Sequence, residues 1–168
     1  MAPGFEVVPA DTPARLGEFR RLCREYAGSL PFSLCFQGFD EEMDSLPGKY
    51  APPMGRLYLA VGPADSQRGV GCGAIRPIAP GECELKRMYV SADHRGLGIG
   101  RAIALRLIED ARRLGYDRVK LDTSADMAAA QGLYRSLGFL PTDRYNDDPL
   151  DDTLYFALDL RAAPGNRA

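Results

Sequence analysis

The sequence predicts a mixed α/β domain, with a mostly antiparallel sheet, a central parallel β-α-β crossover, and helices on both faces of the sheet. A strand pattern at 84–90, a helix pattern at 101–114 and a strand pattern at 119–122 follow one another, and strands joined through a helix are parallel. Strand patterns at 56–61 and 70–77 flank a polar turn and predict an antiparallel hairpin. Helix patterns on either side of these strands would cover both faces.

Length and composition are those of one globular domain. The chain has 168 residues, 45% hydrophobic and 26% charged, which suits a single domain over 1–168 with an ordered core over 1–160 and a frayed tail at 162–168. Its net charge of −2 provides no basic field, so no nucleic-acid partner is expected. We find no apolar run of membrane-spanning length and no signal peptide, which predicts a cytoplasmic protein without a membrane partner.

The first half of the chain predicts short elements interrupted by prolines. A strand at 5–8 ends at Pro9, and Asp11 or Thr12 is placed to cap a helix that runs to about Tyr26. An irregular aromatic stretch precedes a short acidic helix at 40–46, which Pro47-Gly48 ends.

The second half predicts two amphipathic helices, each ended by a glycine. The helix at 101–114 ends at Gly115, and a helix at 127–137 ends at Gly138. Short strands at 139–140 and 153–160 complete the predicted sheet.

Cysteine and histidine residues give no metal-binding pattern. The cysteines at 23, 35, 72 and 83 form no C-x-x-C pair, and His94 is the single histidine, so no metal site is expected. A Cys-His nucleophile pair would need His94 as base, but its position in a turn favours a solvated loop residue.

The glycine-rich stretch Arg95-Gly96-Leu97-Gly98-Ile99-Gly100 lies between a predicted strand and a predicted helix. Bare amides at a helix N-terminus can bind an anion, which predicts a phosphate or pyrophosphate loop. Its R-x-x-G-x-G spacing fits neither G-x-G-x-x-G nor G-x-x-x-x-G-K-[ST]. The alternative is a glycine-rich turn that only caps the helix.

Three segments, one of which contains the glycine-rich stretch, carry a family resemblance. The segment ELKRMYVSADHRGLGIG resembles the fourth strand and pyrophosphate loop of the GNAT superfamily of N-acetyltransferases, and MAAAQGLYRSLGF resembles its A-x-x-L-Y-x-x-x-G-F helix. The segment FQGFDEEMDSLPGKYAPPMGRLYLA resembles a bacterial subgroup of undefined substrate. Many members carry Asn where this chain has Met127.

The resemblance implies acetyl-CoA as co-substrate, with no metal. It implies that amides near Met88 pair with the pantetheine arm, that the glycine loop holds the pyrophosphate, and that Arg95 or Arg101 neutralises a phosphate. The cofactor-binding residues implied are Met88, Tyr89, Val90, Arg95, Gly96, Leu97, Gly98, Ile99, Gly100, Arg101, Ser124, Met127 and Tyr134.

Two residues are candidates for proton transfer, again by resemblance. Glu84 takes the strand position of the family's glutamate base; the alternative is a structural ion pair with Lys86 or a cation of the neighbouring strand. Tyr134 matches the tyrosine near the coenzyme sulfur and is the candidate acid; the alternative is a core tyrosine. Strict alternation would place Glu84, Lys86, Met88 and Val90 on one face of the strand, and Leu85, Arg87 and Tyr89 on the other.

The acceptor pocket is expected from 32–50, the hairpin, and the loop at 144–152. Phe32, Phe36 and Phe39 either line it or close the core. Its acidic residues would suit a cationic amine, although solvated surface charge explains most of them: they are Asp40, Glu41, Glu42, Asp44, Asp147, Asp148, Asp151 and Asp152.

The predicted reaction is acetyl transfer from acetyl-CoA to a primary amine of a small molecule or peptide, by direct attack in a ternary complex. A non-catalytic acyl-CoA-binding sensor or regulatory module is the alternative, and nucleotide binding without acyl chemistry is a third hypothesis that the loop spacing disfavours. Antiparallel edge strands near the C-terminus suggest a homodimer.

Overall fold

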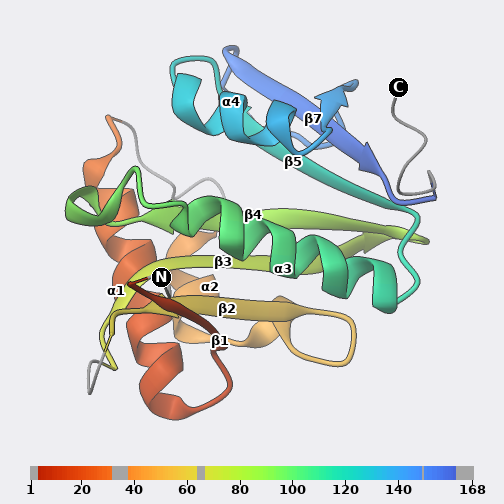
Figure 1. Cartoon of the computed structure of the whole chain (residues 1–168). Coiled ribbons are helices and arrows are strands. Elements are labelled where there is room, and N and C mark those ends of the chain that lie inside the picture. Colours follow the sequence, from red (N-terminus) through yellow and green to blue (C-terminus); the bar gives the residue numbers. More distant parts are fainter. Residues whose placement is uncertain (1–3, 32–37, 64–66, 149, 162–168) are drawn as a thin grey trace.

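In the part of the chain that the structure describes, seven strands form one sheet in the order β1-β2-β3-β4-β5-β7-β6 (Figure 1). The computed structural model describes residues 4–31, 38–63, 67–148 and 150–161. Of the neighbouring strand pairs within these residues, β4 and β5 are parallel and the others are antiparallel. The strands are β1 (Glu6–Pro9), β2 (Arg56–Val61), β3 (Gly69–Ala79), β4 (Glu82–Val90), β5 (Arg118–Ser124), β6 (Leu140–Pro141) and β7 (Thr153–Asp159).

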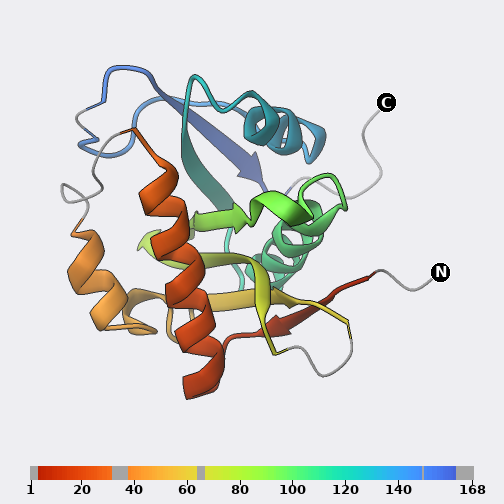
Figure 2. The ribbon, with the colours of Figure 1, turned by 90° about the vertical axis from the view of Figure 1, so that its left-hand side faces the viewer.

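Helices cover both faces of this sheet (Figure 2). Helices α1 and α2 lie on one face, and α3 and α4 lie on the other. Within the described ranges, no helix is both long and apolar enough to cross a membrane. The helices are α1 (Pro13–Ser29), α2 (Phe39–Asp44), α3 (Ile99–Arg113) and α4 (Ala128–Ser136), with short 3₁₀ turns η2 (Gly48–Tyr50) and η3 (Ala92–His94).

The predicted fold class is confirmed, including the β4-α3-β5 crossover, while several element boundaries differ. Helix α3 begins at Ile99, two residues before the predicted start, because Gly98 adopts a left-handed conformation and serves as its N-cap. Helix α4 begins at Ala128, with Met127 as its N-cap, rather than at Met127. Thr12 caps α1 by accepting a hydrogen bond from the Arg15 amide.

Each face of the sheet carries its own apolar core. On the α3 side, Ile103 and Leu107 are fully buried against the strands. On the α1 side, Phe19, Met43 and Tyr50 are fully buried. Strand β2 contributes to both cores, which explains its nearly continuous apolar sequence.

The α3 core gives a direct test of packing. We expect Ile103→Ala to lower the free energy of unfolding by about 2–5 kcal/mol, because Ile103 is fully buried and its loss leaves a cavity. Leu105→Ala is the matched control on the same helix: Leu105 is 47% exposed, so its effect should stay within about 0.5 kcal/mol. Urea denaturation of both variants measures the difference, and equal effects would contradict the core assignment.

Candidate functional site

The parallel pairing of β4 and β5 covers only part of both strands. It runs from Glu82 opposite Arg118 to Glu84 opposite Lys120 and then stops. Strand β4 continues to Val90 and β5 to Ser124, and the two diverge toward the glycine-rich loop (Figure 1). This divergence leaves the edge amides and carbonyls of β4 available to an extended ligand.

The glycine-rich loop lies beside this opening, at the N-terminus of α3. Gly96 and Gly98 have φ values of 80° and 82°, which side chains other than glycine rarely adopt. A Cβ added at either glycine would meet no atom of the described residues within 4 Å, so these residues leave the loop backbone uncovered. Ile99 is buried and anchors the loop, whereas Leu97 is 62% exposed. This loop can offer unpaired helix N-terminal amides to an anion.

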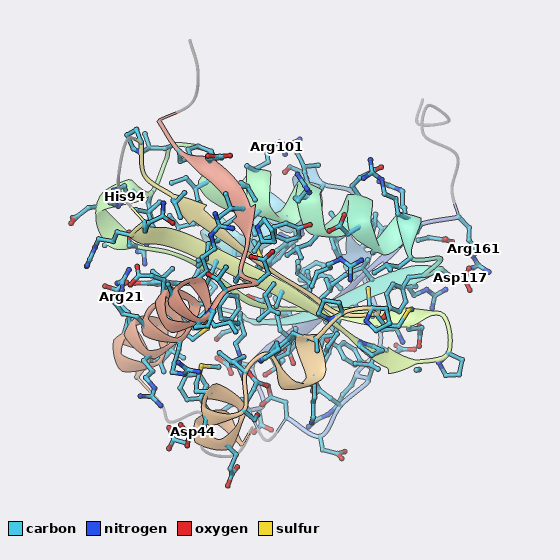
Figure 3. The ribbon with its side chains drawn as sticks, turned by 90° about the horizontal axis from the view of Figure 1, so that it is seen from below. Arg21, Asp44, His94, Arg101, Asp117 and Arg161 are labelled. Atoms are coloured by element: carbon cyan, nitrogen blue, oxygen red, sulfur yellow. The ribbon has the colours of Figure 1, made fainter. Side chains whose placement is uncertain are left out.

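The two arginines of the loop already have partners. Arg95 donates from Nε to the Val90 carbonyl oxygen at 3.2 Å, and its guanidinium lies 5.9 Å from the centre of the Tyr89 ring. Arg101, labelled on α3 in Figure 3, donates to Ser136 Oγ of α4 at 3.0 Å. Both side chains are exposed, and either can reorient toward a phosphate only by giving up these contacts.

Strict alternation along β4 is wrong beyond Lys86. The pairing register between β3 and β4 shifts there, so that one strand carries an extra residue, and Arg87 has a φ of 60°. Leu85 and Met88 therefore both pack in the α3 core, while Tyr89 packs in the α1 core. Val90 joins Met88 on the α3 side, away from Glu84 and Lys86.

Glu84 lies in the ion pair that was the alternative to its base role. Its side chain is 2% exposed, and Arg76 of the neighbouring strand lies 2.9 Å from Oε1. Tyr145 donates its hydroxyl to Oε2 at 2.6 Å, and Lys86 Nζ is 3.9 Å from Oε1. Both carboxylate oxygens are thus already engaged.

Asp122 is a carboxylate at the opening that the sequence interpretation missed. It lies on β5 beyond the last residue paired with β4, and Asn146 Nδ2 donates to its Oδ2 at 2.7 Å. Burial raises its pKa above the ordinary aspartate value, and the Glu84 and Asp148 carboxylates add to the rise. Lys86 and the Asn146 hydrogen bond act in the opposite direction. The sequence feature that could have identified Asp122 is a charged residue near the end of the strand that follows the crossover helix.

Tyr134 extends from α4 into the same region. It is buried and packs edge-to-face on Phe139, with ring centres 5.8 Å apart. Burial raises its pKa, and nearby Tyr26 and Asp122 raise it further, so the phenol keeps its proton near neutral pH.

Met127 and Ser124 connect the end of β5 to other elements. Met127 Sδ accepts hydrogen bonds from the Tyr26 hydroxyl at 3.6 Å and from the Thr123 hydroxyl at 3.8 Å. Ser124 Oγ donates to Asp152 at 3.3 Å. In place of the polar side chain that an asparagine would offer, Met127 therefore forms a contact between α1 and α4.

Of the predicted acceptor segments, residues 38–50 lie on the α1 side, while the β2–β3 hairpin lies in the sheet and contributes to both cores. Phe39 is buried in the core, which is the second of the two roles considered for it, while Phe32 and Phe36 lie outside the described residues. Tyr50 is buried in the same core. At the start of the predicted loop, Tyr145 reaches Glu84 and Asn146 reaches Asp122, so these two residues pack over the opening. Of the acidic residues in α2, Glu42 pairs with Arg87 at 2.6 Å.

Comparisons with known proteins agree on one family. Residues 22–139 match the family model described as acetyltransferase (GNAT) family. An uncharacterised N-acetyltransferase of Schizosaccharomyces pombe is 34% identical over 88% of this chain and 90% of its own length. The uncharacterised N-acetyltransferase YjgM of Escherichia coli is 34% identical over 77% of this chain and 76% of its own.

Solved structures share the fold at low sequence identity. A GNAT-family acetyltransferase of Staphylococcus aureus Mu50 superposes with a TM-score of 0.77 and 18% identity, covering 94% of this chain and 99% of its own. The PaiA N-acetyltransferase of Thermoplasma acidophilum, solved in complex with coenzyme A, gives 0.71 and 15%, covering 92% of this chain and 98% of its own.

Proposed function

The chain belongs to the acetyltransferase (GNAT) family, and from this premise we propose that it acetylates a primary amine of a small molecule or peptide by direct attack in a ternary complex. It is an acetyl-CoA-dependent acyltransferase. The observation that carries the proposal is the opening between β4 and β5 beside an uncovered glycine loop. The opening between the strands fits the thioester-bearing arm of the coenzyme, and the glycine loop fits its pyrophosphate.

The residues that would hold acetyl-CoA follow from this geometry. Amides from Gly96 to Arg101 would bind the pyrophosphate, since no side chain covers Gly96 or Gly98. The backbone of Met88, Tyr89 and Val90 would pair with the pantetheine arm, because that part of β4 has no partner on the β5 side. Coenzyme A bound to the PaiA relative is in keeping with this assignment.

The amine nitrogen must lose a proton before it attacks. A primary ammonium has a pKa of about 10.4, so a carboxylate with an ordinary pKa of about 3.9 is a poor base for it. The difference in pKa between the carboxylate and the ammonium is smaller for Asp122, because the pKa of Asp122 is raised. We therefore assign the base role to Asp122 in preference to Glu84, whose oxygens are held by Arg76 and Tyr145.

The attack places negative charge on the thioester oxygen. The bulge at Arg87 interrupts regular pairing, so the Met88 amide would be directed into the opening and would stabilise that charge, whereas the Tyr89 amide faces its partner Cys72 on β3. The carbon–nitrogen bond forms, the carbon–sulfur bond breaks, and the departing thiolate, with an ordinary thiol pKa of about 8.5, takes a proton.

Tyr134 is the proposed donor of that proton. We expect Tyr134→Phe to lower kcat by about 10²–10⁴-fold, while the Kd for acetyl-CoA changes little, because only the hydroxyl is removed and the ring keeps its packing on Phe139. Thiol-release assays give kcat, and calorimetry gives Kd. Tyr116→Phe, just before the paired end of β5, removes a hydroxyl donating to the Met54 carbonyl oxygen and is the control for a general phenol effect. Unchanged turnover in Tyr134→Phe would remove Tyr134 as the acid.

The proposal as a whole is tested by titrating the purified chain with acetyl-CoA, with ATP and NAD as controls. Selective binding is expected, followed by thiol release with at least one amine from a panel of polyamines, amino acids and short peptides. Absence of acetyl-CoA binding would overturn the proposal. The homodimer and the cytoplasmic location remain predictions, tested by light scattering and by cell fractionation.

A further inference from the structure

Arg87 has an unusual backbone conformation at the centre of the site. It is the one non-glycine residue with positive φ among those that the structure describes, at 60°. A side chain in this region strains the backbone and persists only where the surroundings impose it. The residue also occupies the β4 bulge, directly before the amides of Met88 and Tyr89.

Several contacts hold Arg87 in place. Its Nε donates to Glu42 Oε2 of α2 at 2.6 Å, and the two side chains are only 4% and 14% exposed. Its guanidinium lies over the Phe39 ring at 5.0 Å. The Arg87 carbonyl oxygen accepts a hydrogen bond from Cys72 Sγ at 3.1 Å, so the backbone is fixed as well.

Helix α2 presents both side-chain partners from a fixed position. Phe39 and Glu42 are three residues apart and so lie on one face of the helix. Arg20 of α1 donates to the Met43 carbonyl oxygen at 2.8 Å, and the Met43 side chain is fully buried. Helix α2 is therefore anchored without the help of Arg87.

We propose that Glu42 and Arg87 are positioning residues, which hold the β4 bulge in the conformation that directs the Met88 amide at the thioester carbonyl. This inference rests on the proposed function, because it concerns the same carbonyl. It assigns to α2 a role in the chemical step rather than in acceptor binding alone.

Two matched variants separate backbone positioning from packing. In a Glu42→Gln background, which avoids an unpaired buried carboxylate, Arg87→Ala and Arg87→Gly both remove the guanidinium and its contact with Phe39. They differ only in Cβ, and glycine accepts a φ of 60° without strain whereas alanine does not. If Arg87 only packs, both variants should lose the polarisation of the thioester carbonyl and kcat equally. If Arg87 positions the bulge, the glycine variant should keep most of the polarisation and kcat that the alanine variant loses.

The polarisation is measured with acetyl-CoA labelled with ¹³C at the carbonyl carbon, and this binding measurement needs no acceptor amine. Polarisation by a backbone amide shifts this resonance downfield on binding to the wild-type chain. We expect the Ala double variant to lose most of that shift, with kcat for the fastest amine of the panel reduced about tenfold, and the Gly double variant to recover most of both. Arg24→Gln is the control: Arg24 of α1 pairs with Asp44 at 3.4 Å on the exposed side of α2, where Figure 3 labels Asp44, and its loss should leave the shift unchanged.

The outcomes distinguish the two proposals. If the wild-type chain does not bind acetyl-CoA, the proposed function fails and this inference fails with it. If the wild-type shift appears but the Ala and Gly double variants coincide, with equal melting temperatures, the positioning role alone is overturned.

Discussion

Gly98→Glu should abolish acetyl-CoA binding. Gly98 caps α3 with a φ of 82°, and the space around it is empty. A glutamate there would place a negative charge where the pyrophosphate is expected and fill the uncovered loop. We expect the Kd to rise at least about 100-fold, which corresponds to about 2.8 kcal/mol of lost binding free energy. Isothermal titration calorimetry measures it.

Backbone strain requires a control, because glutamate at positive φ is unfavourable at any position. Gly115 provides the match: it has a φ of 88°, a Cβ there would also meet nothing within 4 Å, and it follows the opposite end of α3. Gly115→Glu should lower the melting temperature by a similar amount but keep normal acetyl-CoA affinity. Equal affinity losses in the two variants would show that strain, and not the lost anion site, explains the effect.

Asp122→Asn should lower kcat by about 10²–10⁴-fold, with acetyl-CoA affinity little changed, because it removes the proposed base and keeps an oxygen for the Asn146 hydrogen bond. In the wild-type chain, kcat/KM should rise with pH as Asp122 loses its proton, through an apparent pKa above the ordinary aspartate value of about 3.9. The variant should lose this limb of the pH profile.

The free energy of unfolding should change with pH in the direction opposite to kcat/KM. The folded-state pKa of Asp122 is raised above its unfolded value, so between the two values the folded chain binds more protons. The free energy of unfolding therefore falls as pH rises through that window, and the deficit persists at neutral pH. Asp122→Asn removes the deficit, and its melting temperature at pH 7 should equal or exceed that of the wild type.

Glu84→Gln is the comparison for the base assignment. It breaks the ion pair with Arg76, whose guanidinium lies 2.9 Å away, and should lower stability. Turnover should fall less than in Asp122→Asn. If Glu84→Gln removed the acid limb of the pH profile while Asp122→Asn kept it, the base role would belong to Glu84, as the family resemblance implies.

The order of elements could be predicted from the sequence because its signals are local. Helical and strand periodicities, Gly115 and Gly138 as helix ends, and the proline-rich breaks each involve residues a few positions apart. The glycine loop was also identified from its spacing, and the structure shows Gly96 and Gly98 in the conformation that only glycine adopts readily.

The face of each β4 side chain could not be predicted, because alternation assumes an uninterrupted strand. A single extra residue at Arg87 reverses the alternation and moves Met88 and Val90 into the α3 core. That bulge is held by Glu42, which lies 45 residues earlier in the chain, so no local pattern reports it.

The sequence by itself determined the element order, the mixed sheet, the glycine loop at the start of α3 and the family resemblance, since each depends on neighbouring residues. Only the tertiary structure decided that Glu84 is held by Arg76 and Tyr145, and that Asp122 lies at the opening between β4 and β5. Contacts and burial depend on segments distant in the chain, and they set the partner and proton affinity of a carboxylate.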